Sequence, residues 1–250
     1  MSNNQSIVIA NWKMKLGVNE SVELAKKIKK ANLKNAELVI CPSFVNLLEV
    51  RDALSRSNIK LGGQDCFWEA EGAYTGEVSA SQLKEAGCNY VILGHSERRK
   101  YLKETDEMVH QKIKMALSAG LTPIVCVGET FDERQRGAQD YILIQQTTRA
   151  FEGIELGLSQ VIIAYEPVWV IGSGQAIAPA EAESAHQVIR QSLFDIFSPE
   201  LVKNNFRIVY GGSVDSNNVS AFIHLANTSG VLVGGASLKA EEFISLIKNV

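Results

Sequence analysis

Hydrophobic and polar residues follow a repeating order along the chain: a short apolar run, a few glycine or polar residues, then an amphipathic stretch. Short, continuous apolar runs are typical of parallel strands that are buried on both faces. We therefore expect strands and helices to alternate throughout. The expected strands are Ile7–Asn11, Leu38–Cys41, Ile59–Gln64, Tyr90–Leu93, Pro123–Val127, Val161–Glu166, Arg207–Tyr210 and Val231–Val233.

The stretches between these runs carry helix signals. Ser79 and Gln82 have the spacing of a capping box, and Gly87 is placed to end that helix. Thr105 precedes two acidic residues that suit the positive end of a helix dipole. Pro179 fits the first turn of another helix. Apolar residues at helical spacing follow two of these helix starts. After Thr105 they are Val109, Ile113, Ala116 and Leu117, and after Pro179 they are Ala185, Ile189, Leu193 and Ile196.

About eight repeats of strand and helix predict a closed parallel (β/α)8 barrel, which we expect to form one domain over residues 1–250. The length of 250 residues and the hydrophobic content of 46% suit one large core. A doubly wound open sheet is the alternative. Its usual fingerprint, a glycine-rich turn after the first strand, is missing, because Asn11-Trp12-Lys13-Met14 stands there.

Composition limits the possible partners and cofactors. A net charge of −3 without long runs of one sign argues against nucleic-acid binding and provides no global field for an anion. No apolar stretch approaches the ~20 residues that span a bilayer, and the first residues do not resemble a signal peptide, so we expect a cytoplasmic protein. The cysteines show no CxxC spacing and the histidines no HExxH pair, so we expect reduced thiols and no metal site.

Polar residues follow several of the expected strands, and sites in such barrels lie at the carboxyl ends of the strands. Because side chains alternate along a strand, Asn11 and Lys13 should continue the inward face of the first strand. By the same alternation His95 should share a face with Leu93, and Glu166 should close the inward face of the sixth strand. Taken singly, a lysine such as Lys13 is more often a solvated strand-end residue than a ligand-binding one. A histidine such as His95 is more often a structural residue, for example a helix cap, than a catalytic one.

The segment after Glu166 is built like a hinged flap. A proline and a tryptophan between aliphatic residues lead to a Gly-Ser-Gly tip. A carboxylate beside such a flap suggests a general base under a lid, although an ordinary surface turn is the alternative. The expected lid residues are Pro167, Val168, Trp169, Val170, Ile171, Gly172, Ser173, Gly174, Gln175, Ala176 and Ile177.

Paired glycines follow the last two strands, at Gly211-Gly212 and Gly234-Gly235. Barrels often hold a phosphate there, because glycine lets backbone N–H groups approach an anion closely, although such pairs also make simple tight turns. A phosphorylated molecule held there would face the polar strand ends. One carboxylate base, Glu166, with His95 and Lys13 to stabilise an enediolate, suits an aldose–ketose isomerisation without a cofactor.

Several segments, spread from the first strand to the last, carry a resemblance to a known family. They are Asn11-Trp12-Lys13-Met14, Gly72-Ala73-Tyr74-Thr75-Gly76-Glu77, Gly94-His95-Ser96-Glu97-Arg98-Arg99, Cys126-Val127-Gly128-Glu129, Ala164-Tyr165-Glu166-Pro167-Val168-Trp169, Tyr210-Gly211-Gly212-Ser213-Val214 and Leu232-Val233-Gly234-Gly235-Ala236-Ser237-Leu238. In these segments the sequence resembles the triosephosphate isomerases. The resemblance implies interconversion of dihydroxyacetone phosphate and D-glyceraldehyde 3-phosphate in glycolysis and gluconeogenesis.

The resemblance also implies roles for individual residues. Glu166 would be the base and His95 the electrophile, and the family is a standard example of a glutamate base beside a neutral histidine and of a closing lid. Lys13 would be the substrate-binding cation, with Asn11 as its partner. The supporting residues would be Glu97, Ser96 and Cys126. The phosphate would be held by Gly172, Ser213, Gly234 and Gly235.

The family resemblance further implies a homodimer in which the loop Tyr74, Thr75 and Gly76 inserts near Lys13 of the neighbouring subunit. The chain departs from the family at Gln175-Ala176-Ile177, where a lysine, then threonine or serine, then alanine is expected after Gly174. Two other functions stay open beside the isomerase. They are another phosphate-binding barrel enzyme, such as a sugar-phosphate epimerase, and a barrel kept as a non-catalytic binding protein.

Overall fold

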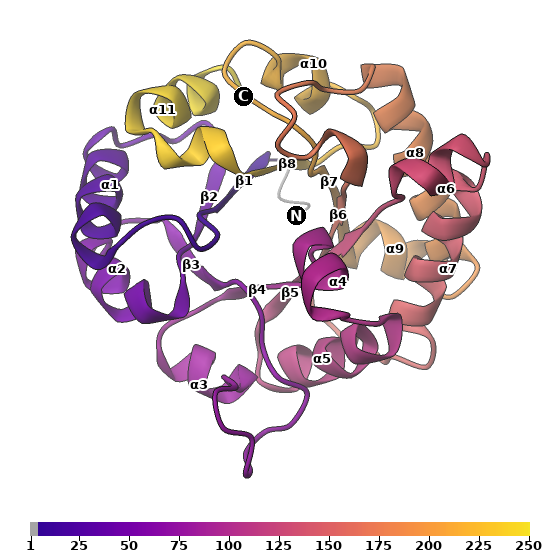
Figure 1. The fold of residues 1–250 in the computed structure, drawn as a ribbon, viewed down its shortest axis with the longest axis horizontal. Coiled ribbons are helices and arrows are strands. Elements are labelled where there is room, and N and C mark those ends of the chain that lie inside the picture. Colours follow the sequence, from indigo (N-terminus) through magenta and orange to yellow (C-terminus); the bar gives the residue numbers. More distant parts are fainter. Residues whose placement is uncertain (1–4) are drawn as a thin grey trace.

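The computed structural model describes residues 5–250, and its strands form a closed barrel in chain order (Figure 1). Neighbouring strands pair in parallel, and the last strand returns to the first, with Ile7 opposite Gly230. This closure confirms the (β/α)8 barrel and excludes the open sheet. The strands are β1 Ile7–Asn11, β2 Glu37–Cys41, β3 Lys60–Gly63, β4 Tyr90–Leu93, β5 Thr122–Val127, β6 Val161–Tyr165, β7 Phe206–Tyr210 and β8 Gly230–Val233.

Helices form a ring around the barrel (Figure 1). Among residues 5–250, none of them is long and apolar enough to cross a membrane. In the part of the chain that the structure describes, the 3-10 helices are η1 Phe44–Asn46, η2 Val168–Val170 and η3 Gly235–Leu238. The α-helices are α1 Val18–Lys30, α2 Leu47–Ala53, α3 Ala80–Glu85, α4 Ser96–Leu102, α5 Asp106–Ser118, α6 Phe131–Gln135, α7 Gln139–Phe151, α8 Pro179–Phe194, α9 Pro199–Asn205, α10 Val219–Ile223 and α11 Ala240–Lys248.

The expected helix ends are confirmed with one exception. Ser79 forms the capping box of α3, and Gly87, with φ +94°, lies just beyond its end. The Thr105 side chain accepts the Met108 N–H at the start of α5, and Pro179 opens α8. However, α8 ends at Phe194, so Ile196 lies outside that helix.

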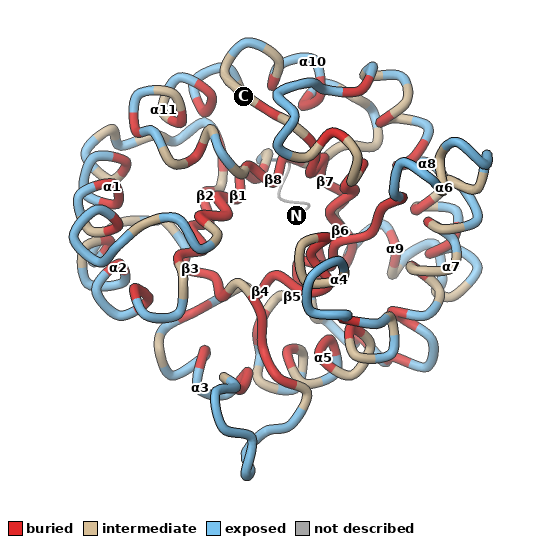
Figure 2. Tube along the Cα trace, viewed as in Figure 1, coloured by how far each residue is buried: buried red, intermediate tan, exposed pale blue. Residues whose placement is uncertain are grey.

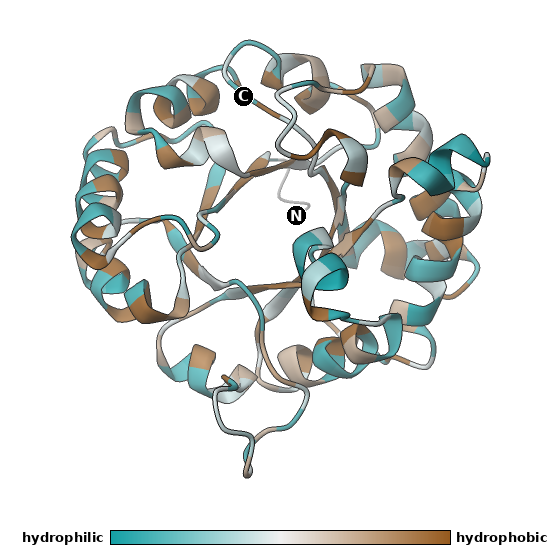
Figure 3. Cartoon of the chain, in the orientation of Figure 1, coloured by the Kyte–Doolittle hydropathy of each residue, from teal (hydrophilic) through white to brown (hydrophobic). Residues whose placement is uncertain are grey.

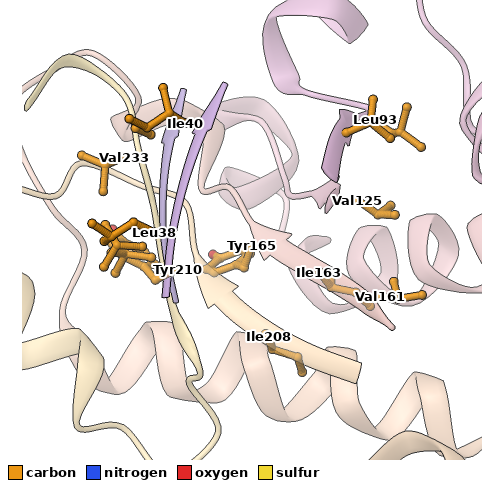
Figure 4. Close-up of a cluster of buried hydrophobic side chains, with 14 of the residues drawn as sticks. Leu38, Ile40, Leu93, Val125, Val161, Ile163, Tyr165, Ile208, Tyr210 and Val233 are labelled. Carbon is orange, nitrogen blue, oxygen red and sulfur yellow. The ribbon is translucent and has the colours of Figure 1, made fainter. Parts of the chain in front are cut away.

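Two layers of apolar side chains hold the barrel together. One cluster contains strand residues alone, which places it inside the barrel; Ile9, Ile92 and Ala164 belong to it. The other lies between the strands and the helices, and Figure 4 shows part of it, including Leu93 and Val125. Figures 2 and 3 show the same division, with buried strands and with helices that turn apolar faces inward and polar faces outward.

The loop between β3 and α3 projects away from the barrel (Figure 1). It includes Tyr74, Thr75 and Gly76, all of which are exposed. A bridge from Phe67 to Ser79 closes its base. Within the loop the Phe67 and Tyr74 rings pack together with centroids 4.6 Å apart, and Tyr74 stays 44% exposed.

Candidate active site

A cavity of about 540 Å³ opens at the carboxyl ends of the strands. It brings together Asn11, Lys13, His95 and Glu166, which lie far apart in the sequence. The glycine pairs after β7 and β8 line the same cavity, as does the tip of the expected lid. Its further lining residues are Lys15, Glu97, Ile171, Gly172, Gly174, Gly211, Gly212, Ser213, Val214, Asp215, Leu232, Gly234, Gly235, Ala236 and Leu238.

Lys13 reaches the cavity through a turn in the backbone. β1 ends at Asn11, whose Oδ1 accepts the Lys13 N–H at 3.0 Å, and Lys13 has φ +53°. This left-handed conformation is costly for a non-glycine residue and needs support from its surroundings. Gln64 provides support, because its Nε2 donates to the carbonyl oxygens of Lys13 and Cys41, both at 2.9 Å. Sequence reasoning extended a strand through Gln64 and missed this role.

The Lys13 ammonium forms an ion pair with Glu97. Their Nζ and Oε1 atoms lie 2.6 Å apart at the edge of the cavity. Glu97 belongs to the first turn of α4, so the pair joins the end of β1 to the loop after β4. Both side chains are only partly buried, so water can reach the pair.

His95 lies in the cavity, but the reason we gave for it is wrong. Ile92 belongs to the cluster inside the barrel, whereas Val91 and Leu93 face the helices. Regular alternation would therefore turn His95 outward. Gly94 has φ +71°, and this left-handed residue interrupts the alternation and turns His95 into the mouth.

His95 combines the two roles that we considered separately. It is the N-cap of α4, where its Nδ1 accepts the Glu97 N–H at 3.2 Å. A nitrogen that accepts this bond carries no proton, so the neutral ring carries its hydrogen on Nε2. Nε2 lies 3.1 Å from the Glu166 Oε1 atom, inside the cavity.

Glu166 lies one residue beyond the end of β6 and is 2% exposed. Its Oε2 accepts the Ser96 N–H at 2.9 Å, at the start of α4. Its Oε1 has no aligned hydrogen bond among residues 5–250, despite the short distance to His95. A buried carboxylate oxygen without a hydrogen bond is costly, so a ligand that donates to it is favoured.

Cys126 lies below Glu166 in the cluster inside the barrel. Burial raises the pKa of the Cys126 thiol, and the neighbouring Glu166 carboxylate raises it further. The thiol is therefore uncharged at neutral pH and packs as a small apolar group.

The two glycine pairs come close to the reacting side chains. A Cβ on Gly211 would lie 3.1 Å from Glu166 Cγ, and one on Gly234 would lie 3.4 Å from Lys13 Cε. A Cβ on Gly235 would meet nothing within 4 Å, which leaves its backbone open to the cavity. Both turns thus present backbone at the same face as the carboxylate and the ammonium.

The lid segment is anchored at its first end. Trp169 donates from Nε1 to Glu129 Oε1 at 3.0 Å, and the Arg134 guanidinium lies 4.7 Å from the indole ring. Burial raises the pKa of Glu129, and hydrogen bonds from Trp169 and Tyr165 oppose that rise. We had quoted Glu129 within a motif without giving it a role; its place two residues beyond β5 is the signal that could have found it.

The far end of the lid is buried and its tip is exposed. Ile177 is 5% exposed, whereas Gly172, Ser173 and Gly174 face solvent, and the two glycines also line the edge of the cavity. The Ser173 hydroxyl donates to the Val170 carbonyl at 2.8 Å and accepts the Gln175 N–H at 3.1 Å. The tip is therefore a compact turn between two anchored ends.

Among residues 5–250, no three side chains of the metal-binding types gather into a site. The cavity brings the Glu166 carboxylate, the neutral His95 imidazole and the Lys13 ammonium beside open backbone turns, and Lys15, Glu97 and Asp215 also line it. Together with the barrel, this arrangement defines an acid–base enzyme of the TIM-barrel class, with room for a small phosphorylated molecule.

Comparison with known proteins specifies the class. The sequence model of the family described as triosephosphate isomerase matches residues 6–250. The chain therefore belongs to the triosephosphate isomerase family and is an isomerase.

Individual relatives agree along the full length. The chain is 44% identical to a triosephosphate isomerase of Endomicrobium trichonymphae over 245 residues, which cover 97% of each chain. It is 46% identical to one of Dehalococcoides mccartyi over 246 residues, or 98% of this chain and 96% of that one. A crystal structure of triosephosphate isomerase from Bartonella henselae superposes with a TM-score of 0.88 at 36% identity and covers 98% of both chains.

Proposed function

We propose that this chain interconverts dihydroxyacetone phosphate and D-glyceraldehyde 3-phosphate through an enediolate, in glycolysis and gluconeogenesis and without a cofactor. One observation carries the proposal. Glu166 Oε1 and His95 Nε2 lie 3.1 Å apart in the cavity that the glycine turns and Lys13 also line. The two groups are in contact in this structure, so the Glu166 carboxylate must move away from the imidazole before a carbonyl carbon and its neighbour can lie between them, with the phosphate at the turns.

Glu166 is the base in this proposal. It takes the proton from the carbon beside the carbonyl and returns it to the neighbouring carbon, so one carboxylate serves both steps. Its Oε1 is buried and accepts no hydrogen bond among residues 5–250, which leaves it available to the substrate. The Ser96 N–H, 2.9 Å from Oε2, holds the carboxylate toward α4 until a ligand draws it over the substrate.

His95 and Lys13 stabilise the oxygens of the enediolate. The His95 Nε2–H donates to the oxygen that gains charge, and the neutral ring follows from the bond that Nδ1 accepts. The Lys13 ammonium balances the anionic substrate, and Asn11 holds the Lys13 backbone through the 3.0 Å bond to its N–H. Glu97 positions Lys13 through their ion pair.

The phosphate-binding groups are backbone N–H groups of the turns. Glycine lets these groups approach a phosphate closely, and the open face of Gly235 supports this role. Closure of Pro167–Ile177 adds a group from the lid tip and excludes water, which protects the enediolate from losing its phosphate. The proposed phosphate contacts are Gly172, Ser213, Gly234 and Gly235.

The test is the variant Glu166→Gln in a coupled assay with D-glyceraldehyde 3-phosphate and no added metal. We expect turnover to fall by several orders of magnitude while binding of dihydroxyacetone phosphate persists, because Gln keeps the shape and loses the base. Near-normal isomerisation by this variant would exclude the proposed mechanism. Epimerisation of a larger sugar phosphate, or binding without turnover by the unmodified chain, would support one of the two other functions.

We propose further that the chain is a cytoplasmic homodimer, built from one domain per subunit. Large apolar side chains are exposed near Lys13 and on the projecting loop: Met14 is 94% exposed, Val45 82% and Tyr74 44%. A second copy whose loop around Thr75 covers Met14 would bury this surface. Sedimentation of the chain and of Thr75→Arg tests this, because a charge at the loop tip should shift the dimer toward monomer and an unchanged mass would contradict the interface.

A further inference from the structure

A second cavity, of about 580 Å³, lies at the amino ends of β2 and β3, opposite the active-site mouth. It is as large as the active-site cavity, and the two share no lining residue. Its walls come from the end of α1, the segment that leads into β2, and the turn before β3. It is therefore a separate concave surface that the isomerisation does not use.

The charge of this cavity is strongly positive. Lys29, Lys34, Arg56 and Lys60 line it, and Glu37 is its one acidic lining residue. The chain as a whole carries a net charge of −3, so the positive cavity is a local concentration and not the result of a basic composition.

Glu37 is already neutralised by residues outside the cavity. Its Oε2 lies 2.7 Å from Arg207 Nη1, and the Tyr90 hydroxyl donates to its Oε1. Glu37 therefore cannot serve as the partner of the cations across the cavity. The local field at the cavity remains that of the lysines and the arginine.

The cations are available to a ligand. Within residues 5–250, Lys34, Arg56 and Lys60 form no ion pair within 4 Å, and each is exposed. The Lys29 ammonium donates to the carbonyl oxygens of Ala53 and Ser55, which fixes its position but leaves its charge uncompensated.

The inner part of the cavity offers an apolar surface. Leu33 and Ile59 are half-buried there, above Ile28 and Leu38 of the core. Arginine and lysine side chains bind phosphate through charge-assisted hydrogen bonds, and apolar walls accept a ring. The geometry points to a binding site for a phosphorylated small molecule that carries an apolar ring, such as a nucleotide, with its phosphates at Arg56 and Lys60.

ADP is the probe, and NMR of the full ¹⁵N-labelled protein is the measurement. We expect saturable shifts of backbone amides at Lys34, Ile59 and Lys60, weakened by added salt. Shifts confined to Ser213 and Gly235 would show binding at the active-site mouth alone and would overturn the proposal. The absence of any saturable shift at millimolar ADP would overturn it as well.

Matched variants separate this site from general surface charge. Arg56→Gln with Lys60→Gln should weaken ADP binding by about tenfold or more, since two charge-assisted contacts to phosphate are lost at exposed positions. Lys114→Gln with Lys203→Gln removes the same charge from exposed positions outside the cavity and should bind ADP like the unmodified chain. Lys34→Gln, on the opposite wall, is the second test should the first variant fold poorly. Equal ADP affinity in all these proteins would exclude the site.

Discussion

Gly128 controls the position of the proposed base, and Gly128→Ala tests this directly. A Cβ at Gly128 would lie 1.7 Å from the Glu166 carbonyl oxygen and 2.5 Å from its carbonyl carbon. Contacts under 3.0 Å are essentially never seen for a Cβ, so the gap must widen by about 1.3 Å. The backbone φ of Gly128 lies outside the left-handed region, so the clash is the sole obstacle to alanine.

The displacement should fall on Glu166. Gly128 is held from behind, because its N–H donates to Gln146 Oε1 at 2.8 Å and its carbonyl accepts from Gln146 Nε2 at 3.3 Å. A misplacement of about 1 Å costs on the order of 100-fold in rate, so we expect kcat to fall by about that factor. Overpacking should cost about 1–3 kcal/mol of folding stability. KM should change less, because the phosphate turns are untouched.

The assay is steady-state isomerisation with thermal unfolding of the same samples. Gly17→Ala is the matched control: a Cβ there would lie 3.5 Å from Glu20 Oε2, an ordinary contact, and its φ of −72° suits alanine. The control should keep the kcat of the unmodified chain and lose about 1 kcal/mol of stability at most, because Gly17 is the N-cap of α1, where alanine is disfavoured. A folded Gly128→Ala variant with kcat within about threefold of the unmodified chain would refute the reasoning, because Glu166 would then tolerate the displacement.

Three further predictions concern residues outside the reacting set. Burial lowers the pKa of His186 to about 3, so the folded state favours the neutral ring. The stability from this preference is complete above pH 6.5 and is lost as the pH falls toward 3, by up to ~5 kcal/mol. Urea unfolding across this range should show a shallower loss of stability in His186→Gln, and the same pH dependence in both proteins would contradict the assignment. Gln64→Ala removes both hydrogen bonds that hold the Lys13 turn, so kcat/KM should fall by about tenfold, and unchanged kinetics would show that the turn holds itself. Glu129→Gln replaces a charged acceptor of the Trp169 indole by a neutral one, which should shift the equilibrium between open and closed lid by about fivefold. Indole fluorescence during a substrate titration measures this shift, and identical titrations of the variant and the unmodified chain would exclude the anchor.

The fold followed from local patterns. All eight predicted strands were confirmed with ends within one residue, because a parallel strand buried on both faces needs an apolar run regardless of its neighbours. Ser79, Thr105 and Pro179 marked helix starts for the same reason, since capping is decided within a few residues. Ile196 fell outside α8 because apolar spacing alone does not show where a helix ends.

The candidate site was found from the sequence, but part of its geometry was reached by a wrong argument. Alternation located Glu166 correctly, because β6 stays regular to its end. For His95 it failed, since the left-handed Gly94 reverses the direction of the side chain. A glycine in a sequence shows that such a turn is allowed; whether it occurs depends on the backbone around it.

The sequence by itself determined the alternation of strands and helices, the barrel, and which polar residues stand at strand ends, because these depend on neighbours along the chain. Tertiary structure alone decided the contacts between distant segments: the Gln64 bonds to the Lys13 turn, the Glu129 anchor of the lid, the fit of Gly128 against Glu166 and the basic cavity beneath the barrel. The physical reason is that periodicity and capping act over a few residues, whereas a hydrogen bond, a close approach or a concentration of charge depends on where closure of the barrel places residues that are tens of positions apart.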